Sequence, residues 1–425
     1  MNPPWTIPEP IPEAQFRHIR LSMIFDHHKW DSQFEDIASL SHRCLILEWE
    51  TWEQLRQWSE LLYAEAIAAE REIVERPDLC KTLGLGRRLQ EACTQTGGRL
   101  PSKAMARVMR FDFHFTTEGW RISEANADVP GGFIESSAFA DLACPCYPGT
   151  SPAPDAAVEY ARAVASALGR GSRIALVHAT AYTDDRQVML FLAERFAGAG
   201  LEPVLAGPTD VLWVEGKAEL AGGERPLDGI VRFFPAEWLP NIPRRHGWQQ
   251  YFHGGTTPQS NPGYSLTIQS KRFPLVWDRL RTGLPTWRTL LPETRDPRQA
   301  AWRNSEEWVL KPALGRVGEW IGIRAVTAEK EWRQIAKNAA RHPQYWAAQK
   351  RFAAIPAGAG GENMYLCLGV FVVDGKACGV YGRASAVPLI DGRAQDIPIL
   401  IRRDIKGNRV DSEAVPAAIL GERAK

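Results

Sequence analysis

The segment from residue 110 to residue 126, RFDFHFTTEGWRISEAN, is the feature of this sequence that most limits how the chain can fold. Polar and apolar residues alternate on both sides of a short polar break, and a period of two is typical of β-strands. The segment is therefore predicted to be a β-hairpin. We expect a three-residue loop of Thr117, Glu118 and Gly119, with Gly119 in the left-handed conformation.

The length of this loop decides which residues face each other across the predicted hairpin. A three-residue loop places Thr116 opposite Trp120, and its other pairs are Asp112 with Glu124 and Arg110 with Asn126. One face then gathers two carboxylates, an amide oxygen and a guanidinium. A two-residue loop would instead place Phe111 opposite Glu124 and leave the acids on opposite faces. We predict the three-residue loop.

Two carboxylates placed directly across a strand pair repel each other unless a cation or the Arg110 guanidinium compensates their charge. A metal ion is the simplest compensation, and hard oxygen ligands of this kind suit Mg²⁺. The charged face is therefore a candidate metal and nucleotide site. The alternative is a solvated hairpin face whose charges are incidental.

Length and charge limit what the chain can bind. A chain of 425 residues exceeds what one core usually serves, so we expect two or three domains or lobes with room for a cleft. The 51 basic and 50 acidic residues leave a formal net charge of +1. This balance argues against a nucleic-acid or membrane-surface protein driven by electrostatics, and the expected ligand is small.

Cysteine usage and hydropathy indicate the cellular setting. The seven cysteines are odd in number and lack Cys-x-x-Cys spacing, which predicts a reduced, cytoplasmic environment. The chain opens without a charged and then apolar run, and no apolar stretch approaches the roughly 20 residues that span a bilayer. We expect a soluble cytoplasmic protein.

Hydrophobic periodicity predicts the order of elements. Residues 51–75 and 83–95 have helical spacing and predict an N-terminal helical layer. Beyond a Pro- and Gly-rich linker, helix, strand, helix and strand are predicted at 155–168, 173–178, 185–199 and 203–205. This order indicates a parallel sheet with helices on its faces. No Gly-x-Gly-x-x-Gly follows its first strand, so a dinucleotide is not supported.

The last third of the chain carries a lysine and a glycine-containing turn. Lys311 is predicted to end a short strand, and the glycines of residues 313–318 can bring backbone amides close to phosphate oxygens. Lys311 supplies a point charge and Arg316 a planar fork for phosphoryl oxygens. An ordinary β-turn with solvated charges is the alternative. Farther on, a hairpin with an Asp374-Gly375 turn is predicted to end at Arg383.

Taken in order, these segments resemble the synthetase part of the glutathionylspermidine synthetase family, whose fold is an ATP-grasp. The family pattern Arg-x-Asp followed by Glu-x-Asn-x-Asp-x-Pro occurs here as Arg110-Phe-Asp112 and Glu124-Ala-Asn126-Ala-Asp128-Val-Pro130. Further similarities are Ser270-Lys271, the loop from Lys311 to Gly318, Gln349, and the hairpin around Asp374-Gly375.

The resemblance implies a mixed α+β and α/β fold, namely an ATP-grasp with a pre-ATP-grasp parallel-sheet domain and an N-terminal helical layer. It divides the chain into a helical segment (1–100), a metal-binding hairpin belonging to the ATP-grasp (101–155), the pre-ATP-grasp domain (156–258) and the nucleotide-binding region (259–425).

The resemblance also assigns roles to single residues. It makes Asp112, Glu124 and Asn126 ligands of Mg²⁺. The residues placed around ATP are Lys271, Lys311, Gly315, Val317, Gly318 and Gln349. Arg110, Arg316 and Arg383 would stabilise the charge that develops during transfer.

The implied reaction joins a small-molecule carboxylate to an amine at the expense of ATP, through an acylphosphate, and releases ADP and phosphate. Two positions depart from the family pattern, since Val129 stands where threonine is common and Ala384-Ser385 follow Arg383 in place of acids. We expect no amidase domain before the synthetase part. The alternatives are a catalytically silent ATP-grasp that binds nucleotide or regulates, and a kinase-like or phosphatase-like enzyme that uses the same metal site on an unrelated fold. A homo-oligomer is left open.

Overall fold

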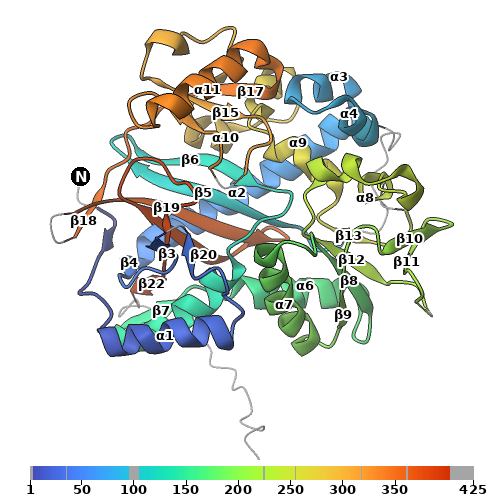
Figure 1. The fold of residues 1–425 in the computed structure, drawn as a ribbon, viewed down its shortest axis with the longest axis horizontal. Coiled ribbons are helices and arrows are strands. Elements are labelled where there is room, and N and C mark those ends of the chain that lie inside the picture. Colours follow the sequence, from blue (N-terminus) through green and yellow to red (C-terminus); the bar gives the residue numbers. More distant parts are fainter. Residues whose placement is uncertain are drawn as a thin grey trace, which may run out of the picture.

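A central antiparallel sheet organises the described part of the chain, which comprises residues 3–34, 36–94, 105–223, 225–253, 255–316, 318–359 and 362–402 of the computed structural model. The strand order is β21-β20-β19-β5-β6, with β18 paired to β19. The strands are β5 (Val108–Thr116), β6 (Gly119–Asn126), β18 (Ala357–Ala359), β19 (Glu362–Val373), β20 (Lys376–Ser385) and β21 (Gln395–Ile397). Both predicted hairpins, β5–β6 and β19–β20, are therefore confirmed (Figure 1).

The loop of the β5–β6 hairpin differs from its prediction. Thr116 pairs with Gly119, so the loop has two residues, and the predicted three-residue loop and its Thr116–Trp120 pair are wrong. The Thr116 hydroxyl tightens the turn, because it accepts a hydrogen bond from the amide of Glu118 (3.1 Å) and donates one to the carbonyl of Gly119 (2.7 Å). Gly119 does adopt the left-handed conformation, with φ of 87°.

A β-bulge in β6 restores the pairing that the loop alone would have lost. Phe113 pairs with Ile122, whereas Asp112 pairs with Glu124, so Ser123 is the extra residue. The two predicted pairs at the open end of the hairpin are confirmed, namely Asp112 with Glu124 and Arg110 with Asn126. The charged face therefore forms as predicted, by a different local route.

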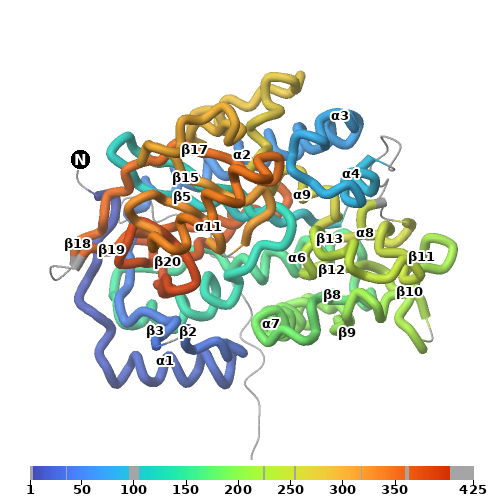
Figure 2. Tube along the Cα trace, turned by 45° about the horizontal axis from the view of Figure 1, so that its top comes forward, coloured from blue at the N-terminus to red at the C-terminus, as the bar shows by residue number. Residues whose placement is uncertain are grey.

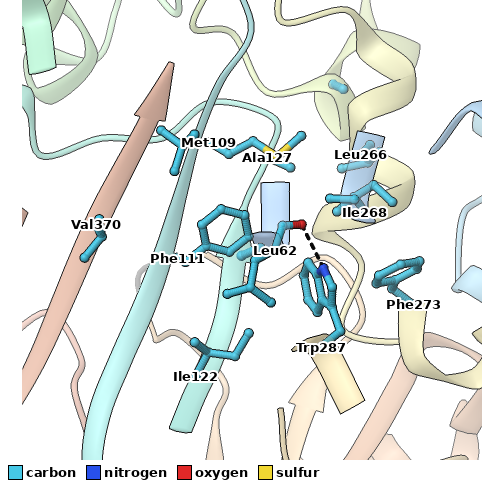
Figure 3. Close-up of a cluster of buried hydrophobic side chains, with 14 of the residues drawn as sticks. Leu62, Met109, Phe111, Ile122, Ala127, Leu266, Ile268, Phe273, Trp287 and Val370 are labelled. Carbon is cyan, nitrogen blue, oxygen red and sulfur yellow. Dashed lines mark hydrogen bonds between the residues drawn. The ribbon is translucent and has the colours of Figure 1, made fainter. Parts of the chain in front are cut away.

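The other face of β5 and β6 is apolar and packs into the core. Phe111 and Ile122 lie with Leu62 of α2 (Trp49–Glu75) and Trp287 of α10 (Pro285–Leu290) (Figure 3). The Phe111 and Trp287 rings meet edge to face with centroids 5.9 Å apart, and the Trp287 indole donates to the Leu62 carbonyl at 3.0 Å. Burial of this face fixes the opposite, charged face toward the cavity described below.

A second sheet lies over the central one (Figures 1 and 2). Its order is β14-β17-β15-β16, with bounds Thr294–Arg295, Trp346–Lys350, Trp308–Pro312 and Gly322–Ile323. One face packs on α11 (Glu329–Arg341), where Trp308 and Leu310 are buried with Trp332 and Ile335. Because side chains alternate along a strand, Lys311 is placed on the opposite face, toward the central sheet.

The predicted βαβ unit forms a parallel sheet beside these two layers. Its order is β13-β12-β8-β9, with bounds Gln259–Ser260, Gly229–Arg232, Arg173–Val177 and Glu202–Ala206, and every neighbouring pair is parallel. Two helices pack on it, α6 (Ala156–Leu168) and α7 (Thr183–Gly198). Asp155 caps α6, since its carboxylate accepts from the amides of Ala157 and Val158. The helices and strands predicted here are confirmed.

A fourth, mixed sheet joins distant parts of the chain. It joins β1 (Trp5–Thr6), β4 (Leu45–Leu47), β22 (Ile399–Arg402) and β7 (Thr150–Pro152) in that order. The predicted N-terminal helices are present as α2 and α4 (Arg87–Thr94). The other strands and main helical segments are α1 (Glu13–Phe25), β2 (Gln33–Phe34), β3 (Ile37–Ala38), α3 (Pro77–Cys80), η2 (Glu135–Phe139), α5 (Ala140–Ala143), β10 (Val211–Val214), β11 (Lys217–Leu220), α8 (Gln250–His253) and α9 (Leu266–Gln269). No helix in the described ranges has both the length and the hydropathy needed to cross a bilayer.

Candidate active site

A cavity of about 490 Å³ lies between the central sheet and the sheet above it. Its walls come from β5, β6, β19 and β20 on one side, from β15, β16 and β17 on the other, and from loops of the parallel-sheet region. The predicted site residues that line it are Arg110, Asp112, Glu124, Asn126, Lys311, Arg316, Gly318, Gln349 and Arg383. Residues far apart in the sequence are thus brought to one space.

Asp112 and Arg110 form an ion pair on the cavity floor, which is the side formed by the central sheet. The guanidinium binds the carboxylate through two contacts, Nε to Oδ1 at 2.8 Å and Nη2 to Oδ2 at 2.9 Å. The Asn126 amide donates a further hydrogen bond to Asp112 Oδ2 at 3.1 Å. Arg110 also donates to the carbonyl of Gly131 at 2.6 Å, which fixes its position. Arg110 therefore compensates the charge of Asp112, one of the two possibilities that the sequence left open.

Glu124 has a cation of its own. Lys271 Nζ lies 3.1 Å from Glu124 Oε2 and donates to the carbonyl of Gly315 at 2.8 Å. Lys271 itself lies behind Glu124, in the wall of a small neighbouring cavity of about 20 Å³. Burial alone would raise the pKa of Glu124, but the charges of Lys271 and Lys311 outweigh burial and hold it below its ordinary value. Glu124 therefore stays ionised near neutral pH.

Lys311 is buried in the opposite wall, and no carboxylate among the described residues is in hydrogen-bond contact with it. Its ammonium donates to the side-chain oxygen of Gln349 at 2.8 Å and to the carbonyl of Ser123 at 3.0 Å. The bulge in β6 therefore has a second role, because Ser123 is the bulged residue whose carbonyl meets Lys311. Burial lowers the pKa of Lys311 to about 8, although the charge of Glu124 opposes that shift. An anion beside this ammonium would restore its ordinary protonation.

Arg316 and the glycine-containing turn lie at the edge of the cavity. Arg316 Nη2 contacts Asp128 Oδ2 at 3.0 Å and Glu237 Oε2 at 2.9 Å, so two carboxylates hold its guanidinium. Gly318 has φ of 72°, and a side chain there would place Cβ 2.4 Å from the carbonyl oxygen of Ile390. Glycine at 318 thus permits both the left-handed backbone and a close approach to another loop. Val317 lies outside the described residues.

Arg383 has one nitrogen donor, Nε, that makes no hydrogen bond to any residue that the structure describes. Its Nη2 donates to the carbonyls of Asp391 (2.7 Å) and Ala394 (2.9 Å), which anchors the guanidinium beside the cavity. Its buried Nε has no hydrogen-bond partner within the described part of the chain, and Asp396 Oδ1 lies 3.9 Å from it. A buried N–H of a cation without a hydrogen-bond partner is costly.

Comparison with known proteins agrees with this geometry. A family model described as glutathionylspermidine synthase preATP-grasp matches residues 26–402. The chain belongs to this family. The predicted family and the predicted mixed fold are thereby confirmed, and family membership supports a ligase role.

The chain was also compared with curated proteins and with solved structures. No curated protein matches the chain. A crystal structure from Methylobacillus flagellatus KT, named "Putative gamma-glutamylcysteine synthetase", aligns with a TM-score of 0.44 and 11% identity, over 76% of this chain and 88% of that one.

Several cavity residues of this glutathionylspermidine synthase-family chain were not assigned from the sequence. His114 shares the charged face of β5; its Nε2 lies 3.0 Å from the Ser123 hydroxyl, and burial lowers its pKa to about 4. Others are Tyr182, Asp184, Asp185, Trp238, Cys367 and Tyr381. Alternation along β5 could have found His114. The start of α7 offered no such signal, because acids in a first helical turn are ordinary dipole partners.

The side chains on the hairpin fit a Mg²⁺ ion of the kind that accompanies a nucleotide. In the ranges described, no three His, Cys, Asp or Glu side chains group in a way that could hold a metal alone. Asp112 and Glu124 supply two carboxylates, and Asn126 supplies an amide oxygen. Mg²⁺ commonly uses one or two carboxylates and completes its shell with water and phosphate oxygens.

Proposed function

We propose that this protein is an ATP- and Mg²⁺-dependent carboxylate–amine ligase that forms an amide through an acylphosphate and releases ADP and phosphate. One observation carries the proposal: the facing carboxylates Asp112 and Glu124 and the buried ammonium of Lys311 line the same cavity from opposite walls. Phosphoryl transfer needs cations around the phosphate oxygens and little covalent chemistry from the protein.

The cavity wall formed by β15, β16 and β17, here called the upper wall, is suited to the nucleotide. Lys311 and Gln349 would contact the phosphates, with Lys271 acting through Glu124 and Gly315. Three apolar side chains at the same wall, Val309, Ile323 and Leu389, pack together and line the cavity. They offer the apolar surface that a purine ring needs.

Asp112, Glu124 and Asn126 would hold Mg²⁺, which when bound neutralises charge on the phosphate oxygens. In the structure Arg110 already holds Asp112. Arg110 would therefore share that carboxylate with the ion and turn part of its hydrogen bonding toward the transferring phosphoryl group.

The chemistry requires no nucleophile from the protein. An oxygen of the substrate carboxylate attacks the terminal phosphorus, and the bond from that phosphorus to the bridging oxygen breaks, so ADP leaves. The amine nitrogen then attacks the acyl carbon, phosphate leaves with the electron pair of the broken C–O bond, and the nitrogen loses a proton. Arg110 and Arg383, which line the cavity, would stabilise the oxyanions, and Arg316 would join them on leaving Asp128 and Glu237.

Acids at the start of α7 suit the amine. Asp184 and Asp185 line the cavity beside the aromatic rings of Tyr182 and Trp238. Burial raises the pKa of Asp185 to about 6. A carboxylate of that pKa is ionised at neutral pH yet basic enough to accept the proton that the amine releases.

A catalytically silent, nucleotide-binding protein is the second candidate. It is favoured by the observation that Asp112, Glu124, Asp128 and Glu237 already have cationic partners in the structure. Such pairing is also what a resting active site shows before its ligands arrive, so activity must decide between the two.

The deciding experiment is amine-dependent ADP release with Mg²⁺, measured across a panel of carboxylic acids and amines. Turnover that needs both an acid and an amine supports the ligase. A nonhydrolysable ATP analogue that binds with no turnover on any pair would favour the silent protein. Asp112→Asn should raise the Mg²⁺ concentration that turnover requires, and the matched control is Glu118→Gln, on the same hairpin but with a side chain 73% exposed.

We propose that residues 1–100, 101–155, 156–258 and 259–425 act as the helical segment, metal-binding hairpin, pre-ATP-grasp domain and nucleotide-binding region. We also propose a cytoplasmic location and small-molecule substrates.

A further inference from the structure

A buried ammonium from the N-terminal segment lies next to the proposed reaction centre. Lys29 is 3% exposed. Its Nζ contacts Asp31 Oδ2 at 2.9 Å and Asp396 Oδ2 at 3.0 Å, and it also pairs with Glu135. Glu135 belongs to η2, a π-helical turn that follows the Gly131-Gly132 stretch of the cavity wall. One ammonium thus joins a carboxylate of its own segment, Asp31, to two carboxylates from distant segments, Glu135 and Asp396.

The segment that carries Lys29 is fastened to the parallel-sheet region. The amide of Trp30 donates to Gln187 Oε1 at 2.7 Å, and Gln187 Nε2 donates to Asp31 Oδ1 at 2.6 Å. Gln187 lies in α7, whose first turn supplies Asp184 to the cavity. The position of Lys29 is therefore set by well-made hydrogen bonds rather than by the ion pairs alone.

A short chain of contacts leads from Lys29 into the cavity. The Tyr381 hydroxyl donates to Asp396 Oδ1 at 2.8 Å, while Lys29 holds the other oxygen of the same carboxylate. The Tyr381 ring lines the cavity, and Arg110 Cζ lies 5.0 Å from its centroid, within the range of a cation–π contact. The ring also packs on Gly132, where a Cβ atom would lie 2.8 Å from it.

Arg383 is the other cation near Asp396. Its Nε lies 3.9 Å from Asp396 Oδ1 and has no hydrogen-bond partner among the described residues. With Lys29 in place, Asp396 already has an ammonium on Oδ2 and a hydroxyl donor on Oδ1, and Arg383 lines the cavity with its Nε outside hydrogen-bond distance of this carboxylate. Without Lys29, Arg383 would be the cation left to pair with Asp396.

We propose that Lys29 is a positioning residue of the reaction centre, which holds Asp396 as the acceptor for Tyr381 and thereby leaves Arg383 available to an anionic group of the substrate. The inference rests on the proposed ligase function and adds to it a residue outside the cavity. Lys29 would act on the acid substrate through Asp396, Tyr381 and Arg383, and not on the nucleotide, because Lys311 and Gln349 lie in the opposite wall.

The test compares Lys29→Met with Lys29→Arg, which keeps the charge. The matched control is Lys337→Met, since Lys337 is exposed on α11. For Lys29→Met we expect kcat/KM for the acid to fall about 10- to 100-fold, the range found when outer partners of a site are removed. The affinity for a nonhydrolysable ATP analogue should not change, and Lys29→Arg should recover part of the loss.

The pH profile separates this role from a merely structural one. The charged groups around Lys29 and Asp396 are Asp31, Glu135, Asp184, Tyr381 and Arg383. Burial raises the pKa of Glu135, and the ammonium of Lys29 opposes that rise. Removal of Lys29 should therefore raise the pKa of Glu135 further, and the acid limb of kcat/KM should move to higher pH with it. An unmoved acid limb, or losses of acid and nucleotide binding in equal proportion, would overturn the proposal.

Two further measurements keep the inference testable if Lys29→Met folds poorly or if the wild-type protein shows no turnover. Tyr381→Phe removes a single hydroxyl and should weaken binding of the acid without weakening binding of the ATP analogue; unchanged acid binding would count against the relay. A crystal structure of Lys29→Met needs no activity, and Arg383 Nε should move to within hydrogen-bond distance of Asp396. An unmoved Arg383 would refute the Lys29 inference, whereas absent wild-type turnover would refute only the ligase.

Discussion

The floor and the upper wall of the cavity differ in how their buried charges are paired. On the floor each carboxylate has its own cation, Arg110 for Asp112 and Lys271 for Glu124. In the upper wall Lys311 is surrounded by neutral oxygens of Gln349 and Ser123, and burial lowers its pKa to about 8. The floor is thus balanced without a ligand, whereas the wall has a cation that an anion would stabilise. This difference indicates that a bound phosphate would be stabilised most beside Lys311.

The largest effect should follow removal of the wall cation. We expect Lys311→Ala to weaken binding of an ATP analogue on the order of 100-fold, because a hydrogen bond to a charged group contributes roughly 1.5–3 kcal/mol and Lys311 would make more than one. Isothermal titration calorimetry measures the affinity of each variant for the ATP analogue. Lys337→Met on exposed α11 is the control, and near-normal affinity in Lys311→Ala would remove the wall from the proposed nucleotide site.

A smaller effect is expected on the floor. Asp112→Asn should raise the Mg²⁺ concentration needed for half-maximal ADP release by about tenfold or more, since a neutral amide is a poorer ligand than a carboxylate. It also leaves Arg110 without its charged partner. The measurement is a Mg²⁺ titration of ADP release, with Glu118→Gln as the control. An unchanged Mg²⁺ requirement in Asp112→Asn would indicate that the hairpin has only a solvated or structural role.

The pH dependence of nucleotide binding sharpens the comparison further. A lysine whose pKa in the free protein is about 8 is charged below that pH, so affinity for the ATP analogue should be highest below pH 8 and decline above it. Binding near pH 8 should take up protons, because the phosphates favour the charged lysine. Glu124→Gln removes a charge that raises the pKa of Lys311, so the decline should start at lower pH. Affinity that stays constant through pH 9 would contradict this account.

The smallest effect on the site should come from the apolar face of the same hairpin. Trp287→Phe loses ring area against Phe111 and the hydrogen bond to the Leu62 carbonyl. We expect a loss of about 2 kcal/mol in the free energy of unfolding, measured by urea denaturation, with little change in nucleotide affinity at temperatures where the variant is folded. A large loss of affinity would show that the two faces are not independent.

The hairpin shows how far local pattern could predict the site. Alternation correctly placed Arg110, Asp112, Glu124 and Asn126 on one face, because side chains on a strand alternate whatever surrounds it. The loop length was wrong, because the Thr116 hydroxyl favours a tighter turn than Gly119 suggested. The bulge at Ser123 could not be predicted, since its carbonyl meets Lys311 from a distant strand.

The glycine-containing turn shows the limit more clearly. Its glycines were expected to let amides approach phosphates, and that role remains a proposal. In the structure a side chain at Gly315 would meet Pro312, and one at Gly318 would meet the loop at Ile390. Arg316 was expected to face a phosphoryl group, yet Asp128 and Glu237 hold it. Apart from the approach of Gly315 to Pro312, none of these contacts is local, so no sequence pattern could have indicated them.

By itself the sequence determined the β-period of the two hairpins, the βαβ order and the residue types gathered on the charged face, because alternation and helix periodicity depend only on neighbours in the chain. Only the tertiary structure decided which cation pairs with each carboxylate, and that Lys311 meets neutral oxygens instead of a carboxylate among the residues described. Pairing within hydrogen-bond distance depends on residues that the fold brings together from remote segments, as Lys271 meets Glu124 and Lys29 meets Asp396. The balance between burial and nearby charge, and hence the protonation of the site, is set at that level.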